Sequence, residues 1–261
     1  MRSSIRDIFV SRGTRRAALV ITIVLPALLI AYAWFMNHRP PLHIKSEWTF
    51  QDTLIQNSDL ILSFLFLIVS ALPFYLVFDR KKVKARELTP IALMAALCVV
   101  GRAAFSLIPL PNFKPVSAII IITALAFGPE AGYLTGALAA ILSNFLFGQG
   151  PWTPWQMFSF GIIGFFAGIL YKKGILKARK ADLCIYGFLS VVLIYGGIMN
   201  PASILMAYGH ITKESLLAFY ISGLPVDLVH AASTVVFLCI MSRPLLTKLE
   251  RIKAKYGLIQ L

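Results

Sequence analysis

The chain has 261 residues, of which 58% are hydrophobic and only 14% are charged, and its formal net charge is +14. Soluble domains carry about 25% charged residues, so this composition excludes a soluble domain and predicts an integral membrane protein. The basic residues stand in short clusters between apolar runs, which argues against a nucleic-acid partner. The three cysteines lie in apolar segments without pairing spacing, so neither a disulfide framework nor a zinc site is expected.

The N-terminal third is predicted to be an extension with two membrane spans. Residues 17–36 and 58–78 are apolar runs of about the 20 residues that a bilayer requires. The basic linker 79–87 follows them and is the predicted domain boundary, so the extension with its linker covers residues 1–86.

Six further spans are expected after this linker, within a core at residues 87–241. Thr89 and Pro90 are typical of a helix N-cap and a first helical position, so span three is expected from there to about residue 108. Span four, at 116–127, is only about 18 Å long at helical rise and cannot cross the hydrocarbon alone.

Spans five to eight are expected at 131–147, 155–171, 183–205 and 216–241. Gly196-Gly197 and Asn200-Pro201 are predicted to interrupt the seventh span. The basic tail 242–261 has apolar residues at helical spacing and is predicted to lie along the inner membrane surface. The expected fold class is all-α: a polytopic membrane bundle with a two-helix N-terminal hairpin before a six-helix core.

The distribution of Lys and Arg predicts the orientation of these eight crossings. The N-terminus, the 79–87 linker, the 172–182 loop and the tail each contain five of the 25 basic residues. Placing these four segments inside obeys the positive-inside rule and leaves Arg39, Lys45, Lys114 and Lys213 outside. Both termini are therefore expected in the cytoplasm, with the protein in the cell membrane.

Small residues recur at every fourth position in the centre of the core: Gly128, Gly132, Gly136, Ala140, Asn144 and Gly148. On a helix this spacing aligns them along one stripe, where close backbone approach holds membrane helices together. The stripe is therefore predicted to be a packing seam. It leads into a Gly/Pro/Trp loop at 148–155, which is interpreted either as the mouth of a binding site or as a plain turn with interfacial Trp anchors.

Motifs for common catalytic chemistry are absent from the sequence. No Gly-x-x-x-x-Gly-Lys-Ser/Thr loop, His-Glu-x-x-His helix or Gly-x-Ser-x-Gly elbow occurs. Arg102, Asp227 and His230 are the ionisable residues expected well inside the membrane, and Arg102 and Asp227 are expected to pair, to snorkel or to serve a ligand. No catalytic residue, metal site or cofactor is predicted, and the chain is expected to bind a solute rather than to react with it.

Several runs of the core occur in a distinctive order. They are Leu88-Thr-Pro-Ile-Ala-Leu-Met-Ala-Ala-Leu97, Phe127-Gly-Pro-Glu-Ala-Gly132, Gly136-Ala-Leu-Ala-Ala140, Gly148-Gln-Gly-Pro-Trp-Thr-Pro-Trp-Gln-Met-Phe158 and Gly161-Ile-Ile-Gly-Phe-Phe-Ala-Gly168. In this order and spacing, residues 87–241 resemble the substrate-binding S component of an energy-coupling factor (ECF) vitamin transporter. The two leading spans depart from that family, because most S components lack them.

The resemblance implies a prokaryotic importer subunit that binds a vitamin near the extracellular face. It implies three protein partners: a transmembrane coupling subunit and two ATPase subunits. Docking to the coupling subunit is expected through an Ala-x-x-x-Ala pattern, met here by Ala92 and Ala96. The alternative interpretation is that these two alanines only pack within the bundle.

Aromatic and amide side chains near the predicted outer face suit a flat ligand with polar edges. The candidate ligand-binding residues are Asn112, Phe113, Asn144, Gln149, Trp152, Trp155 and Gln156, with Asn200 and Asp227 deeper in the bundle. The loop at 148–155 most resembles S components for cobalamin. Two other function classes stay open: a membrane enzyme for a lipid or prenyl substrate, with Asp227 and His230 as its only local candidates, and a structural or assembly subunit.

Overall fold

The computed structural model describes residues 85–208 and 211–257, together with four isolated positions before them. In chain order the elements are α5 (Ala85–Ala104), α6 (Val116–Phe127), α7 (Pro129–Phe147), α8 (Trp152–Lys172), α9 (Lys180–Leu189), η3 (Ser190–Gly196), α10 (Gly197–Tyr208) and α11 (Lys213–Tyr256). All regular elements of this part are helices, as predicted. The two N-terminal spans lie outside the described residues, so the count of eight crossings stays a prediction.

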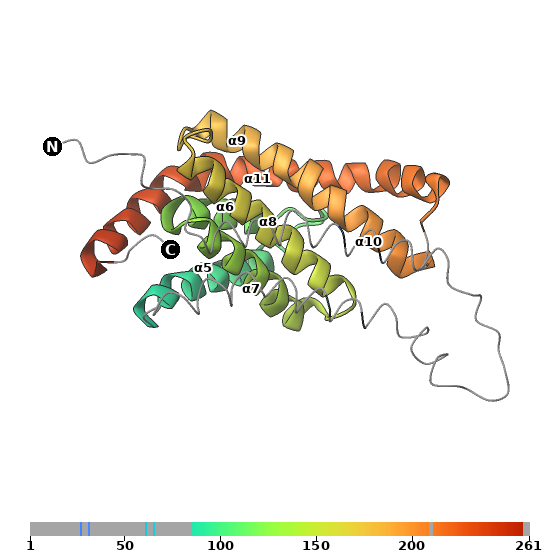
Figure 1. Ribbon diagram of the computed structural model, residues 1–261, viewed down its shortest axis with the longest axis horizontal. Helices are drawn as coiled ribbons and strands as arrows, with labels where there is room; N and C mark the ends of the chain where they lie inside the picture. The colour runs from blue at the N-terminus through green and yellow to red at the C-terminus, as the bar shows by residue number, and fades with distance from the viewer. Residues whose placement is uncertain are drawn as a thin grey trace.

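Helix α6 lies at the centre of the bundle, among α5, α7, α8 and α11 (Figure 1). All twelve of its residues are buried. It is apolar on every face, and such a helix requires a protein environment all round. The predicted bounds of this short span are confirmed. Its length is tolerated because other helices, rather than lipid, surround it.

Helices α7 and α8 share the most extensive interface of the bundle. A Cβ atom added at Gly132 would come within 2.8 Å of the Gly164 carbonyl oxygen, and one added at Gly136 within 2.5 Å of the Phe160 carbonyl carbon. At the end of the interface where α7 begins, a Cβ on Gly168 would meet the Pro129 backbone at 2.5 Å. The two backbones are therefore in direct contact at Gly132 and Gly136, which confirms the predicted packing seam there, whereas nothing lies within 4 Å of a Cβ added at Gly148, the last residue of the stripe.

The seventh predicted span forms a continuous helical segment from Lys180 to Tyr208, so the predicted interruption at Gly196-Gly197 and Asn200-Pro201 was wrong. Pro201 has no N–H to donate to the carbonyl four residues earlier. The seven-residue π-helix η3 ends directly before the helical turn that leads to Pro201. The backbone adopts the wider π-helical conformation there instead of breaking. Short π-helical segments within α-helices are frequent at functional sites.

Helix α11 has 44 residues and continues through the predicted tail as far as Tyr256. It begins at a capping box between Thr212 and Ser215 and ends at Gly257, which adopts the left-handed conformation. Helix α5 likewise begins at Ala85, four residues before the predicted N-cap, and includes Pro90. Four described segments are long and apolar enough to span a membrane: α7, α8, the 180–208 segment and α11.

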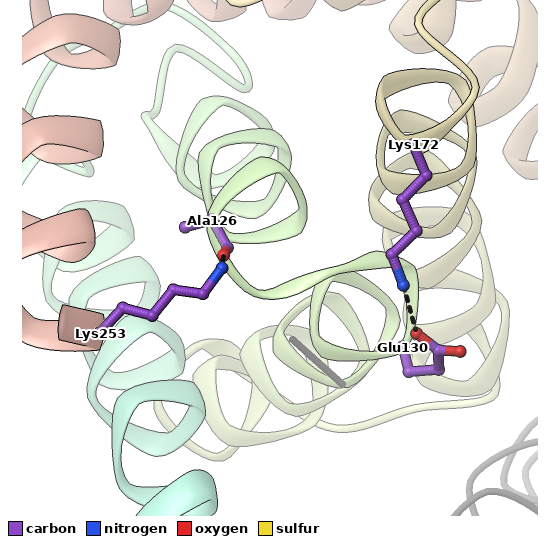
Figure 2. A network of polar contacts seen from close by, with 4 residues as sticks. All are labelled: Ala126, Glu130, Lys172 and Lys253. Carbon is purple, nitrogen blue, oxygen red and sulfur yellow. Dashed lines mark hydrogen bonds and ion pairs between the residues drawn. The ribbon is translucent and has the colours of Figure 1, made fainter. Parts of the chain in front are cut away.

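Two lysines hold the junction between α6 and α7 at the end of the bundle that is predicted to face the cytoplasm (Figure 2). Lys253 of α11 donates from Nζ to the Ala126 carbonyl oxygen at 3.1 Å, where α6 ends. Lys172 at the end of α8 lies 3.9 Å from Glu130 in the first turn of α7. Each charge complements a helix terminus, because carbonyls at a C-terminus attract cations and N–H groups at an N-terminus attract carboxylates.

The seam predicts opposite effects for two helical glycines. A Cβ at Gly164 would lie 2.5 Å from the Gly132 backbone, whereas nothing lies within 4 Å of a Cβ at Gly197. We expect Gly164→Ala to destabilise the protein by about 1–3 kcal/mol through overpacking. Gly197→Ala should be neutral or stabilise it by up to about 1 kcal/mol. Thermal unfolding of both variants in detergent measures the difference, and equal stability of the two would contradict a direct backbone contact.

Candidate functional site

A cavity of about 360 Å³ lies where α5 ends and α7 ends. Arg102, Phe105 and Ser106 line it from α5 and the turn that follows, residues 108–114 from the connecting loop, and Phe147 from the last turn of α7. This volume falls within the range of small-molecule sites, about 300–1,000 Å³. The walls combine phenylalanine rings with one guanidinium, one ammonium and one amide, so the cavity can hold a ring and orient its polar edge.

Arg102 joins α5 to α7 across the cavity wall. Its Nη1 donates to Ser143 Oγ at 2.5 Å and to Asn144 Oδ1 at 2.7 Å. The guanidinium carbon also lies 4.6 Å from the centroid of the Phe147 ring. These neutral contacts hold the charged group inside the bundle, where an isolated charge is costly.

Asn144 connects this arginine to α8. Its Nδ2 donates to Thr153 Oγ1 and to Gln156 Oε1, both at 2.9 Å. Thr153 in turn donates to Gln149 Oε1 at 2.9 Å. The polar end of the small-residue stripe is therefore a hydrogen-bonded network, and the network sets the position of the Arg102 side chain.

Lys114 is only 9% exposed although it belongs to a loop. Ser233 of α11 holds its backbone, accepting from the Lys114 N–H and donating to the Lys114 carbonyl oxygen, each at 2.9 Å. Lys114 Nζ donates to Asn112 Oδ1 at 2.8 Å. Burial, and secondarily the charge of Arg102, lowers the pKa of Lys114 to about 7, because both disfavour the ammonium form.

Two of the aromatic walls belong to one phenylalanine cluster. The Phe105 and Phe113 rings are 6.2 Å apart, and both contact Phe237 of α11, at 4.8 and 5.7 Å between centroids. Phe237 is buried behind them. The cluster fixes the two cavity-facing rings, which lowers the entropic cost of stacking a ligand on them.

The predicted ligand-binding residues fall into three groups. Asn112 and Phe113 line the cavity, and Asn144, Gln149 and Gln156 belong to the network behind it. Trp152, Trp155, Asn200 and Asp227 do not line it. Trp155 is packed in a separate apolar cluster, and Trp152 is 39% exposed.

Asp227 and Arg102 do not pair. Asp227 Oδ2 accepts from Asn200 Nδ2 at 2.9 Å, whereas Arg102 binds Ser143 and Asn144. His230 shares a hydrogen bond with Ser117 at 2.9 Å rather than with Asp227. Within residues 88–208 and 211–257, no group of three or more His, Cys, Asp or Glu residues is placed to hold a metal.

Of the eleven described residues that line the cavity, the sequence predicted two, Asn112 and Phe113, and missed nine, among them Arg102, Phe105, Lys114 and Phe147. Arg102 carried a usable signal, because an ionisable residue inside an apolar span indicates a functional site by default. Phe105 and Phe147 carried none, since phenylalanines in apolar spans have the same pattern whether they face lipid or a ligand.

Comparison with known proteins supplies a family. The family described as the S component of ECF-type riboflavin transporters matches residues 82–251. A UPF0397 protein of Clostridium perfringens is 27% identical over 126 residues, which are 45% of this chain and 65% of that protein. The chain thus matches slightly less than two thirds of the length of this curated relative. No solved structure matches significantly.

The two loop tryptophans should differ sharply in their effect on stability. Trp155 is 3% exposed within its cluster, so Trp155→Ala should cost about 3–5 kcal/mol, as deletion of a buried large side chain does. Trp152→Ala, at a half-exposed position, should change stability by no more than about 0.5 kcal/mol. Thermal unfolding monitored by size-exclusion tests both, and a stable Trp155→Ala protein would contradict the buried position of this ring.

Proposed function

This chain belongs to the family of S components of ECF-type riboflavin transporters, and from that premise we propose that it captures a small vitamin in the Arg102–Phe113 cavity for import. The observation that carries the proposal is the cavity itself. Rings fixed by their own packing and polar groups fixed by hydrogen bonds converge on one pocket, which is the usual construction of a small-molecule site.

The family consists of transporter subunits that bind substrate, not of enzymes. The residues that could have supported a lipid- or prenyl-modifying enzyme do not act together, because Asp227 bonds to Asn200 and His230 to Ser117. No feature of the described residues favours the enzyme hypothesis.

A flavin-sized ligand agrees with the cavity better than cobalamin does. The family is named for riboflavin, a compound with one flat ring system and a polyol chain. Cobalamin has a far larger corrin ring with an appended nucleotide, and a cavity of about 360 Å³ lies near the lower limit for ligand sites. Riboflavin is therefore proposed as the representative of the ligand class, and cobalamin is the alternative ligand that the binding test must include.

We place the cavity at the extracellular end of the bundle. The basic 172–182 loop, Lys253 and the α6–α7 junction lie at the other end, where the positive-inside rule favours the cytoplasm. This orientation lets the cavity take a solute from outside while the inner end faces the ATPase subunits.

We further propose that α5 docks on a transmembrane coupling subunit, which works with two ATPase subunits. Ala92 and Ala96 are both exposed on α5, with Leu93 and Val100 beside them, whereas Ile91 and Met94 face the core. Two exposed alanines one turn apart leave a shallow surface where a partner helix can approach closely. Their exposure supports docking over packing within the bundle.

The ligand prediction is tested by flavin fluorescence with the purified chain in detergent. Riboflavin should bind, with quenching of its fluorescence, and cobalamin should not compete with it for the site. Phe113→Ala should lower the affinity about tenfold, because the ring loses both area and aromatic contact. Phe188→Ala provides the matched control, since Phe188 is 38% exposed on α9 and does not line the cavity. Tight cobalamin binding without flavin binding would overturn the assignment.

The docking prediction is tested by co-purification with the coupling subunit. Ala92→Leu with Ala96→Leu should abolish the complex, because side chains of that size prevent close helix approach. Ligand binding by the isolated chain should be retained. The same double change at Ala218 and Ala232, which are exposed on α11, should leave the complex intact. Survival of the complex in the α5 variant would place docking on another surface.

A further inference from the structure

We propose that the ligand of this cavity carries an anionic oxygen group, phosphate or carboxylate, beside its planar ring, and that Arg102 and Lys114 bind that group. The inference rests on the proposed function and goes beyond it, because riboflavin itself is uncharged. It follows from two cations that share one cavity in which no described residue supplies a counter-charge.

Arg102 has hydrogen-bonding capacity that its protein partners do not use. A guanidinium has five N–H donors in a planar fork that matches a carboxylate or phosphate. Both of its hydrogen bonds to described residues leave from Nη1, to Ser143 and Asn144. Within the described part of the chain, Nη2 and Nε have no hydrogen-bond partner. The group is thus held in place by one nitrogen while two remain available.

Lys114 repeats this arrangement from the loop that lines the cavity. Its ammonium has three donors, and one of them reaches the neutral Asn112 Oδ1. Ser233 fixes the backbone on both sides of its Cα, so the side chain starts from a set position. Burial lowers the pKa of Lys114 to about 7, and an anion bound beside it would raise this pKa again by favouring the ammonium form.

Carboxylates of the described residues lie elsewhere. None of them lines the cavity. Glu130 lies beside Lys172 at the opposite end of the bundle, and Asp227 is engaged by Asn200. Buried Lys114 and half-buried Arg102 face one cavity, where their charges repel each other and are partly desolvated. A bound anion relieves both costs at once, and a neutral ligand relieves neither.

The position of the rings relative to the cations indicates a single ligand with two parts. Phe105 and Phe113 form one aromatic wall, and Phe147 lies directly against the Arg102 guanidinium at 4.6 Å. A planar ring can stack on these walls while an anionic substituent reaches the two cations. Inorganic phosphate alone would use the charges and leave the rings uncovered.

The direct test compares riboflavin with flavin mononucleotide, which differ by one phosphate group. Affinities of the purified chain, measured by fluorescence quenching in detergent, should favour the mononucleotide by at least about tenfold, as expected for one well-placed ion pair. Lys114→Gln should remove most of this preference, measured as the ratio of the two affinities in the variant against the same ratio in the wild-type chain. Lys177→Gln removes an equal charge from an exposed loop and should have no effect.

Arg102→Gln serves as the second variant, and Arg102→Lys as its charge-preserving partner. If Arg102→Gln fails to fold, because Ser143 and Asn144 lose their partner, Lys114→Gln still decides the question. Equal affinity for the two flavins in the wild-type chain would overturn the anion inference and leave the proposed flavin function standing.

Failure of both flavins to bind would reject the flavin assignment, and a second matched pair then decides the inference. Nicotinate should raise the melting temperature in a Lys114-dependent way, and its amide should not. Stabilisation by neither nicotinate nor flavin mononucleotide would overturn the inference. Phosphatidylglycerol is tested in the same assay. If it alone stabilises the chain through Lys114, the anion is a lipid headgroup and a soluble ligand is rejected.

Discussion

The direct backbone contact between α7 and α8 is the constraint on which the rest of the bundle depends. Helices in lipid gain little from burying apolar side chains against one another, because the lipid tails are equally apolar. The contact at Gly132 and Gly164 therefore has to supply stability through close packing. It also fixes the rotation of α7, and this rotation directs Asn144 toward α8 and Arg102. The polar network forms because the small-residue seam sets the distance between α7 and α8 and the rotation of α7 about its own axis.

The same contact explains how a short helix can lie inside a membrane protein. Helix α6 is too short to match a bilayer, yet every residue of it is buried by the helices around it. The seam brings α7 and α8 together on one side of it, and α11 covers another. This arrangement also brings the end of the loop before α6 into contact with α11. Lys114 consequently ends up buried beside Ser233 instead of in solvent.

Local sequence patterns predicted the individual helices well, but they did not predict which residues of different helices meet in the cavity. The four-residue spacing of glycines predicted the seam, and the length of the apolar run predicted the bounds of α6. The interruption predicted at Gly196-Gly197 and Asn200-Pro201 was wrong because glycine and proline indicate only a weak helix, and the segment from Lys180 to Tyr208 stays helical in its tertiary context. The cavity joins residues from the ends of α5 and α7, about 40 positions apart in sequence. Only the folded arrangement could bring Arg102, Lys114 and Phe147 together, so the sequence identified two of its walls, Asn112 and Phe113, and missed the charges.

Helix α5 carries both proposed surfaces, and their spacing constrains how they can influence each other. Arg102 follows Ala96 by six residues, about 9 Å along the helix axis. The Arg102 end is bound to α7, and Gly101 abuts Pro115 so closely that a Cβ there would lie 2.5 Å from the ring. The C-terminal end of α5 therefore cannot shift without moving the Arg102 contacts or the loop that carries Lys114. If the proposed ligand binds both cations, it restrains this end of α5, and the alanine face belongs to the same helix. On these two proposals, we expect occupancy of the cavity to influence the docking face through α5 itself.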